Sequence, residues 1–343
     1  MENKGRKYRI AEIAEICGVS KATVSRVINH SAQGVGKETR NKVQKVIDEL
    51  DYRPNVLARS IATRRSNMIG LITPDVSNFF YPEIIRSVTD YMDSKGYSVL
   101  IANSDYDPQK EAAQLLRMID LRADGIILCS GVSNSEFLKD FRKYHVPLGL
   151  LGRTFDSSLS DVSISGNNVA GGYKSAKYLI DGGNKRIAYI EGNPNISGSQ
   201  QRMEGYKKAL RESGIQFLQE LVISGDYSIQ FGKQTVQNLL SNHVDFDAIM
   251  TGSDLIAIGI VSELLRQGIR VPEEKEVIGF DNIELSSIFY PPLTTISKPH
   301  YDMAQHLSRQ LVNAIEGNSI ALAHTTVEPS LVIRETTKKR KGE

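Results

Sequence analysis

Residues 10–31 of this 343-residue chain read IAEIAEICGVSKATVSRVINHS, and the stretch predicts two short helices separated by a tight turn. Apolar side chains recur at helical spacing from Ile10 to Cys17. Gly18 interrupts this pattern where the chain needs a positive φ, and Ser20 stands where a helix N-cap belongs. The spacing therefore predicts a helix-turn-helix.

The second predicted helix has an apolar face and a polar face. Its apolar face would pack against the first helix through Val24, Val27 and Ile28. Its outer face carries Lys21, Ala22, Ser25 and Arg26. In DNA-binding proteins such a second helix enters the major groove, whereas an ordinary αα-hairpin with a polar face is the alternative reading of the same pattern.

The distribution of charge favours the DNA-binding interpretation. Residues 1–66 hold 14 Lys and Arg against 7 Asp and Glu, a net charge of +7, and residues 67–343 hold 28 against 33, a net charge of −5. A basic head on an acidic body is what phosphate binding by one small domain predicts. Basic faces are often merely solvated, but here the charge coincides with the helix-turn-helix pattern.

Length and composition narrow the class of protein. A chain of this length suggests two or three domains. No apolar run approaches the roughly 18 residues that span a membrane, and no secretory signal is visible at the N-terminus, so we expect a cytoplasmic protein. Cys17 and Cys129 lie in apolar patterns, which indicates buried free thiols. The His and Cys residues show no metal-ligand spacing, and we expect no metal and no cofactor.

Further along the chain, a third helix is predicted over residues 37–50 and a short helix over residues 55–61, after Pro54. From residue 68 onward, strand patterns alternate with helical patterns. We predict strands at residues 68–72, 98–102, 125–129, 147–151, 186–190, 221–223, 248–251 and 277–280. We predict helices at residues 81–95, 109–121, 135–144, 169–181, 199–213, 229–241 and 255–266. This alternation predicts two α/β lobes with parallel sheets, and a cleft between them lined by strand-end loops.

The chain resembles the LacI–GalR family of bacterial transcription regulators over nearly its whole length. The matching stretches are GVSKATVSRVIN (18–29), ETRNKVQKVIDELDYRPNVLARSI (38–61), IGLITPDVSNFF (69–80), ADGIIL (123–128), RMEGYKKAL (202–210), VIGFDN (277–282) and PLTTI (292–296). The resemblance implies an all-α helix-turn-helix head with a hinge helix. It also implies a two-lobed α/β body like that of periplasmic sugar-binding proteins, with three crossovers between the lobes.

The resemblance also implies the domain organisation. Residues 1–53 would form the DNA-binding domain, residues 54–66 the hinge helix and linker, and residues 67–343 the effector-binding and dimerisation domain. Lobe 1 of this last domain would comprise about 67–166 and 293–327, and lobe 2 about 167–292 and 328–337.

Carried over by position, the resemblance implies DNA contacts in the head and hinge. Lys21, Ala22 and Arg26 would face base edges, and Arg26 could donate bidentately to guanine. Phosphate contact, packing or support of backbone contacts is implied for Thr23, Ser25, Asn29 and Tyr52. The implied hinge contacts in the minor groove are Asn55, Ala58, Arg59, Ser60 and Ile61. Ile61 stands where the family usually has a Leu wedged between base steps, and packing against its dimer mate is the alternative.

In the body, several residues match the ligand-contact positions of the family. They are Asp75, Phe80, Tyr81, Asn103, Asp105, Arg153, Arg202, Tyr227, Ser253, Asp254 and Asp281. Polar groups that bracket hydroxyls and aromatic rings that stack on a pyranose are what a sugar site needs. Phe80 and Tyr81 could equally pack the lobe, and Asp75 and Asp254 could cap loops. Ser253 replaces the Asn of many sugar-responsive members, and two arginines hint at an anionic sugar derivative.

These observations predict a sequence-specific DNA-binding transcriptional regulator, most simply a repressor. It would bind a near-palindromic double-stranded operator as a homodimer, associate with the nucleoid through that operator, and be switched by a sugar, sugar acid or sugar phosphate. Both inducer and corepressor responses, and both dimer and tetramer, stay open. The alternatives are a solute-binding module for sugar uptake and a purine-type, corepressor-dependent regulator. Because no GxGxxG after a strand, GxxxxGK[ST], GxSxG or HExxH is present, an enzyme is disfavoured.

Overall fold

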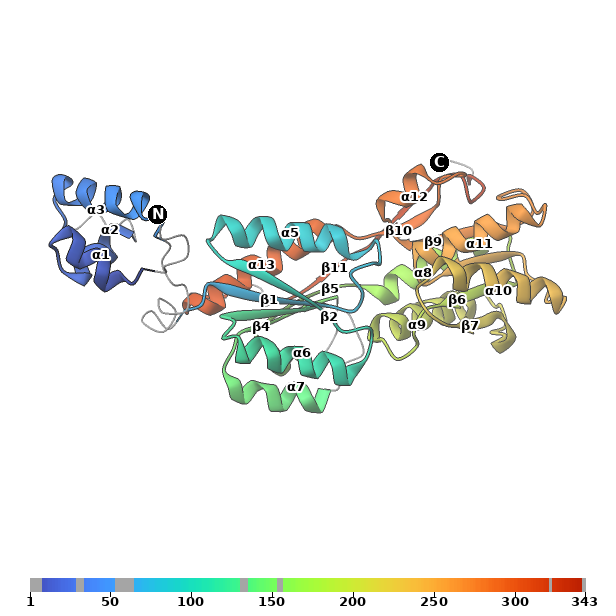
Figure 1. Cartoon of the computed structure of the whole chain (residues 1–343). Helices are drawn as coiled ribbons and strands as arrows, with labels where there is room; N and C mark the ends of the chain where they lie inside the picture. The colour runs from blue at the N-terminus through green and yellow to red at the C-terminus, as the bar shows by residue number, and fades with distance from the viewer. Residues whose placement is uncertain are drawn as a thin grey trace. The chain divides into compact units, whose positions relative to one another are not determined.

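The computed structural model describes residues 8–28, 34–52, 65–129, 135–152, 157–320 and 323–340. The chain divides into two compact units, a head formed by Met1–Ser66 and a body formed by Asn67–Glu343 (Figure 1). Most of the predicted hinge, including Asn55 and Ala58 to Ile61, lies outside the described residues, as do Asn29 and Arg153.

The head contains the three helices that the sequence predicts: α1 (Ile10–Cys17), α2 (Lys21–Ile28) and α3 (Lys37–Glu49). Gly18 ends α1 with φ of 64°, and its N–H donates to the last turn of that helix. Ser20 caps α2, because its Oγ accepts a hydrogen bond from the Thr23 N–H at 3.1 Å. The apolar faces close one small core formed by Ile13, Ala14, Cys17, Val24, Val27 and Val43.

Lobe 1 of the body is a six-stranded parallel sheet in the order β11-β5-β4-β3-β1-β2. Its strands are β1 (Met68–Thr73), β2 (Ser98–Asn103), β3 (Gly125–Cys129), β4 (Leu148–Leu151), β5 (Val162–Gly166) and β11 (His324–Val327). Helices α5 (Tyr81–Ser94) and α13 (His300–Glu316) cover one face, and α6 (Pro108–Asp120) and α7 (Ser135–Phe141) cover the other (Figure 1).

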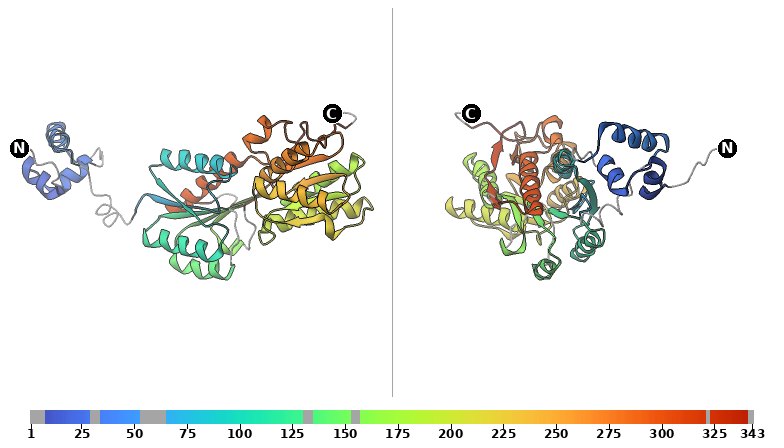
Figure 2. Two further views of the ribbon diagram at one scale, coloured as in Figure 1. Left: turned by 45° about the vertical axis from the view of Figure 1, so that its right-hand side comes forward. Right: turned by 90° about the vertical axis from the view of Figure 1, so that its left-hand side faces the viewer.

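Lobe 2 repeats this plan with the order β12-β10-β9-β8-β6-β7. Its strands are β6 (Ile187–Glu191), β7 (Val222–Ser224), β8 (Ala248–Thr251), β9 (Glu276–Asp281), β10 (Thr295–Ser297) and β12 (Ser330–Val332), of which only the last runs antiparallel to its neighbour. One face packs against α8 (Asn168–Asp181) and α9 (Ser197–Glu212), and the other against α10 (Ile229–Ser241) and α11 (Asp254–Arg266). A short helix, α12 (Glu284–Ile288), follows β9. Figure 2 shows the same layering from two other sides.

Helices α8 and α9 cross at very close range because glycines line the contact. A Cβ added at Gly172 would lie 2.2 Å from the carbonyl oxygen of Arg202, and one added at Gly205 would lie 2.1 Å from that of Val169. Both distances are far inside van der Waals contact, so only glycine fits. This close crossing fixes the start of α9, which carries Arg202, relative to the rest of lobe 2.

Three crossovers join the lobes, at residues 166–168, 297–300 and 327–330. The middle crossover differs from the expected lobe boundary at residue 293. Thr295–Ser297 pairs in register with Gly279–Asp281 and therefore belongs to the sheet of lobe 2. The chain returns to lobe 1 only after residue 297. Strands β5, β10, β11 and β12 and helices α12 and α13 were not among the predicted elements. Strands β10 and β12 have only three residues each, which is too few to show a pattern.

Among the described residues, no helix is long and apolar enough to cross a membrane. Within the same part of the chain, no cluster of three or more His, Cys, Asp or Glu side chains could hold a metal ion.

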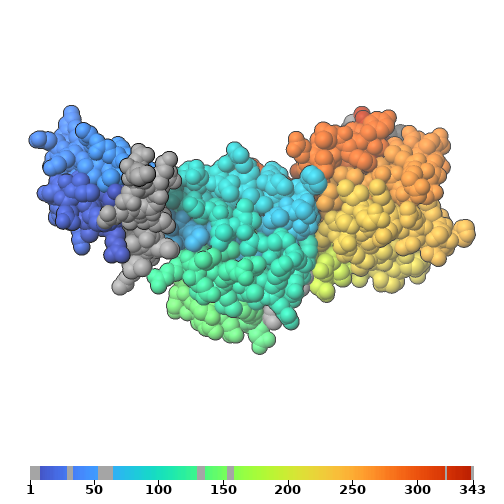
Figure 3. Space-filling view, in the orientation of Figure 1, coloured from blue at the N-terminus to red at the C-terminus, as the bar shows by residue number. Residues whose placement is uncertain are grey.

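The space-filling view shows the two lobes of the body meeting along a shared boundary (Figure 3).

Candidate DNA-binding surface and effector pocket

Helix α2 presents its polar side chains outward, as the amphipathic pattern predicts. Val24 and Val27 are buried in the head core, whereas Lys21, Ala22 and Arg26 are exposed. An exposed row of a cation, a small residue and a second cation on one helix suits contact with the edges and phosphates of a duplex.

The other predicted DNA contacts of the head take part in its internal structure. Thr23 contributes its N–H to the cap and its hydroxyl lies 2.9 Å from that of Ser20. Ser25 is half-buried on the same helix. Tyr52 is half-buried against the head core, and its N–H donates to the carbonyl oxygen of Ile47 at 2.9 Å. Burial raises the pKa of Tyr52, so the hydroxyl keeps its proton and can donate.

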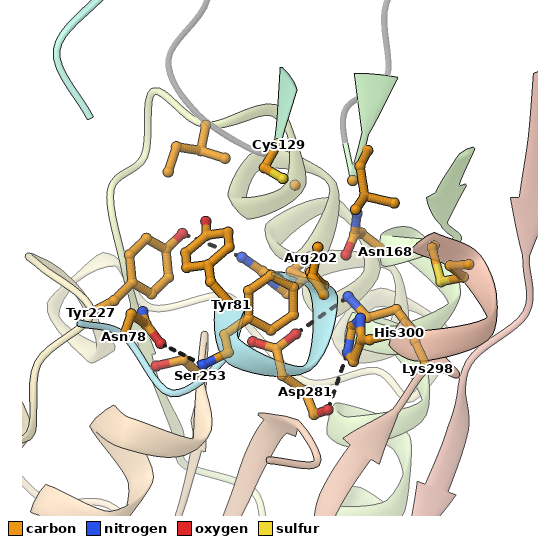
Figure 4. A pocket seen from close by; sticks show the side chains of 18 of the residues that line it. Asn78, Tyr81, Cys129, Asn168, Arg202, Tyr227, Ser253, Asp281, Lys298 and His300 are labelled. Atoms are coloured by element: carbon orange, nitrogen blue, oxygen red, sulfur yellow. Dashed lines mark hydrogen bonds and ion pairs between the residues drawn. The ribbon is translucent and has the colours of Figure 1, made fainter. Parts of the chain in front are cut away.

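In the body, a pocket lies at the carboxyl ends of both sheets, between the lobes (Figure 4). Lobe 1 contributes mainly apolar and aromatic side chains, which are Phe80, Tyr81, Ile84, Tyr106, Cys129, Leu151 and Met303. Most polar groups come from lobe 2 and the crossovers, and these are Asn168, Arg202, Tyr227, Ser253, Asp281, Lys298 and His300. The pocket thus has an apolar wall facing a polar one, which is the usual composition of a small-molecule site.

Aromatic rings from both lobes meet at this pocket. Phe80 stands edge-on to Tyr81, with ring centroids 4.9 Å apart, and to His300, at 4.6 Å. Tyr106 of lobe 1 stacks on Tyr227 of lobe 2 at 5.7 Å and 29°. Burial raises the pKa of Tyr81, Tyr106 and Tyr227, so all three phenols stay protonated and available as hydrogen-bond donors.

A charged cluster forms the polar wall. Arg202 lies over the ring of Phe280 at 4.6 Å, and Lys298 lies 4.8 Å from the same centroid. The Nζ of Lys298 is 3.3 Å from the carboxylate of Asp281, and Nε2 of His300 is 3.2 Å from the carbonyl oxygen of Asp281. Burial lowers the pKa of His300 to about 4, and the charge of Lys298 adds to this effect, so the imidazole is neutral at pH 7.

Asp281 occupies its position through an unusual backbone conformation. It ends β9 with φ of 105°, and Asn282 follows with φ of 55°. A positive φ is rare for residues other than glycine and costs conformational energy, and such strain is concentrated at functional sites. The turn directs the carboxylate to Lys298 and the carbonyl group to His300.

Of the eleven predicted ligand contacts, six line the pocket: Phe80, Tyr81, Arg202, Tyr227, Ser253 and Asp281. Ser253 also caps α11, since its Oγ accepts from the N–H of Ile256 at 3.3 Å.

Four of the others do not line the pocket, and each is bonded within the protein. Asp75 accepts hydrogen bonds from the N–H and hydroxyl of Ser77, at 2.9 and 2.7 Å, which closes a local turn. Asn103 accepts from the N–H of Val76 at 2.9 Å and donates to Asp105, and Asp105 also pairs with Lys110.

Asp254 lies beneath the pocket floor and connects two segments of lobe 2. Its side chain is buried, with the residue 1% exposed, and it accepts from the N–H of Ile283 at 2.8 Å and from the hydroxyl of Thr295 at 2.5 Å. Burial raises its pKa well above the ordinary value. Because of these two hydrogen bonds, both side-chain oxygens of Asp254 are bonded within lobe 2.

Several pocket residues were not among the predicted contacts. Asn78, Tyr106 and Asn168 each follow the end of a strand closely, and Tyr106 directly follows the predicted Asp105. Lys298 and His300 follow β10, a strand of only three residues. The rule that sites lie at strand ends would have identified them, had that strand been recognised.

Comparison with known proteins identifies the family of the chain. Residues 66–339 match the family described as periplasmic binding proteins and sugar binding domain of LacI family, and residues 9–55 match bacterial regulatory proteins of the lacI family. The chain therefore belongs to the LacI family, and it is a DNA-binding transcription regulator and not an enzyme.

The chain is similar over nearly its whole length to HTH-type transcriptional regulators. It is 33% identical over 334 residues to the HTH-type transcriptional regulator DegA of Bacillus subtilis (strain 168), covering 96% of this chain and 98% of that protein. It is 36% identical over 330 residues to the HTH-type transcriptional regulator RegA of Clostridium saccharobutylicum, with coverage of 96% and 98%.

Solved structures of transcription regulators have a similar fold. The lac repressor dimer bound to operator and the anti-inducer ONPF has a TM-score of 0.86 at 26% identity, covering 97% of this chain and 99% of that one. A complex of the transcriptional regulator CelR with cellobiose has a TM-score of 0.72 at 28% identity, with coverage of 96% and 100%.

Proposed function

We propose that this chain is a dimeric repressor that binds a near-palindromic operator through α2 and changes its operator affinity when a small hydroxylated effector fills the pocket between the lobes. One observation carries the proposal: the same chain combines an exposed, basic helix-turn-helix face with a pocket lined by both lobes. A ligand that contacts both lobes favours one relative position of the lobes over another, and differential affinity of this kind is what a switch requires.

Base reading is assigned to α2. Lys21, Ala22 and Arg26 face base edges in this proposal, while Thr23, Ser25 and Tyr52 position the head on the backbone. Replacing Arg26 by Ala should relax sequence preference, at a cost of about 1–3 kcal/mol for the lost base contact. Unchanged preference in a binding-site selection would contradict this role for Arg26.

The effector is assigned to the pocket. Within the described part of the pocket, Nε of Arg202 and Oδ1 of Asn168 have no hydrogen-bond partner, although both residues are buried. Buried donors and acceptors are costly when unpaired. A ligand hydroxyl or carboxylate would supply an acceptor to Arg202, and a ligand hydroxyl would supply a donor to Asn168. We therefore propose a sugar or sugar derivative.

A second copy of this chain is the proposed partner of the body. Phe79, Ile288 and Tyr290 are exposed, and Ile288 and Tyr290 are 71% and 82% exposed. Exposed large apolar side chains often mark protein interfaces. The similar lac repressor structure is a dimer. Replacing Ile288 and Tyr290 by Ser should then weaken self-association in analytical ultracentrifugation.

The central experiment measures operator affinity of the full chain with and without an effector found by a thermal-shift screen of sugars, sugar acids, sugar phosphates and purines. Deleting residues 1–66 should abolish operator binding and leave effector binding intact. Replacing Asp281 by Ala should remove the response to effector and leave the operator affinity measured without effector unchanged. Specific operator binding by the truncated body, or a normal response in the Asp281 variant, would contradict the proposal.

A further inference from the structure

The described part of the pocket carries more positive than negative charge. Arg202 and Lys298 are cations, and Asp281 is the one carboxylate among the described lining residues. His300 is neutral at pH 7, because burial lowers its pKa to about 4. Asp254, below the floor, is not part of the lining, and its oxygens are bonded to Ile283 and Thr295.

Among the described residues, Lys298 forms an ion pair with Asp281, whereas Arg202 has no carboxylate in ion-pair contact. Arg202 is 6% exposed, and its Nε has no hydrogen-bond partner among the residues that the structure describes. Its Nη2 donates to the hydroxyl oxygens of Ser199 at 3.4 Å and Tyr227 at 3.3 Å. Ser199 and Tyr227 also bond to each other at 2.6 Å. A buried guanidinium is costly unless an anion balances it, and a carboxylate is its best-matched partner.

Lys298 is placed in the pocket by specific packing. Its side chain is 8% exposed, and its stem passes against Gly166, where an added Cβ would lie 2.3 Å from Cδ of the lysine. A side chain at position 166 would therefore displace Lys298 from its observed position. Burial lowers the pKa of Lys298; the charges of Asp281 and Asp254 oppose this change, and the charge of Arg202 reinforces it. The two carboxylates thus compensate the charge of Lys298 incompletely.

We propose that the effector is a small hydroxylated monocarboxylate, such as a sugar acid, and that Lys298 is the residue that selects its carboxylate over the neutral hydroxyl of the corresponding sugar. This inference rests on the proposed function, because it assumes that the effector binds in this pocket. Among the described lining residues, one excess cation matches one carboxylate. A phosphate monoester carries about −1.5 to −2 at pH 7 and would exceed that charge.

The test compares matched pairs of probes on the full chain by isothermal titration calorimetry. The pairs are galacturonate with galactose, glucuronate with glucose, and gluconate with sorbitol, and glucose 6-phosphate is added as the dianion. We expect at least one acid to bind at least about tenfold more tightly than its neutral counterpart. Lys298→Met should lower the affinity for that acid by at least about tenfold, whereas Lys298→Arg should retain the preference.

Controls separate charge selection from loss of structure. Lys185→Met removes an exposed lysine of lobe 2 and should change no affinity. The paired variant Lys298→Met with Asp281→Asn removes both charges and avoids leaving the carboxylate unpaired. Melting curves of each variant report whether the body still folds. If Lys298→Met does not fold, the paired variant and Lys298→Arg carry the comparison.

Three outcomes would overturn the proposal: no acid of the panel binds at millimolar concentration, a neutral sugar or the phosphate binds as well as the acid, or the acid preference survives without Lys298. A neutral sugar that binds, depends on Arg202 and changes operator affinity would reject the acidic effector and leave the proposed function standing. Failure of the proposed function itself would show separately, as a protein that binds no operator specifically either with or without effector.

Discussion

Replacing Asp254 by Ala tests whether this carboxylate supports the fold or contacts the effector. In the structure it ties the start of α11 to the loop after β9 and to β10, through the N–H of Ile283 and the hydroxyl of Thr295. Both donors are buried, so the variant leaves two of them without an acceptor. Each unpaired buried donor costs about 1–3 kcal/mol. The hydroxyl of Thr295 can reorient, and the expected loss of unfolding free energy is therefore about 2–4 kcal/mol.

For a body of this size, that loss corresponds to a fall in Tm of roughly 5–12 °C. The assay is thermal denaturation of the full chain, followed at the transition of the body by circular dichroism and calorimetry. Asp254→Asn should give an intermediate value, because the amide keeps one acceptor oxygen. Asp226→Ala is the matched control: it is exposed and accepts one local hydrogen bond from the N–H of Ser228 at 2.9 Å, so its effect should stay below about 1 kcal/mol.

A contrary result is easily recognised. If Asp254→Ala melted at the temperature of the parent protein but lost stabilisation by the effector, Asp254 would be a ligand contact and the reasoning from its two buried hydrogen bonds would be wrong. If both properties were retained, the two bonds would contribute nothing measurable. The expected pattern is a lower Tm together with a retained increase in Tm on adding effector.

Three further predictions concern the pH dependence, the helix crossing and the head. Burial lowers the pKa of His300 from 6.5 in the unfolded chain to about 4 in the folded one, so the free energy of unfolding should fall by about 3 kcal/mol as the pH drops from above 6.5 to below 4. Urea unfolding at a series of pH values should show a weaker pH dependence for His300→Gln. An identical pH dependence would exclude His300 as the cause. Gly205→Ala should destabilise the body by more than about 2 kcal/mol, because the added Cβ would clash with the carbonyl oxygen of Val169. An unchanged Tm would contradict the close crossing of α8 and α9. Ser20→Ala should lower the free energy of unfolding of the head by about 1 kcal/mol, because the N-cap of α2 is lost. This loss should appear as a lower melting temperature of the head helices. An unchanged melting temperature would mean that the cap hydrogen bond contributes little.

The sequence alone was sufficient for the elements with a strong repeating pattern. The spacing of Ile13, Cys17, Val24 and Val27 predicted the core of the head, and the structure buries all four. Two fully buried strands, Gly125–Cys129 and Ala248–Thr251, were also predicted at their observed bounds. In these segments the sequence pattern predicts the correct element, because a helix with one buried face and a strand buried on both faces each have a characteristic apolar pattern.

Only the tertiary structure separated side chains that look alike in the sequence. Asp254 and Asp281 both stand at strand ends, yet one is bonded beneath the floor and the other faces the cavity, because a positive φ turns the chain at Asp281. Lys298 reaches the pocket because β10 pairs with β9 and the crossover after it passes Gly166. A sequence pattern reports periodicity within one element. Which polar groups converge depends on contacts between different segments of the chain, such as Gly166 with Lys298, and only the fold decides these contacts.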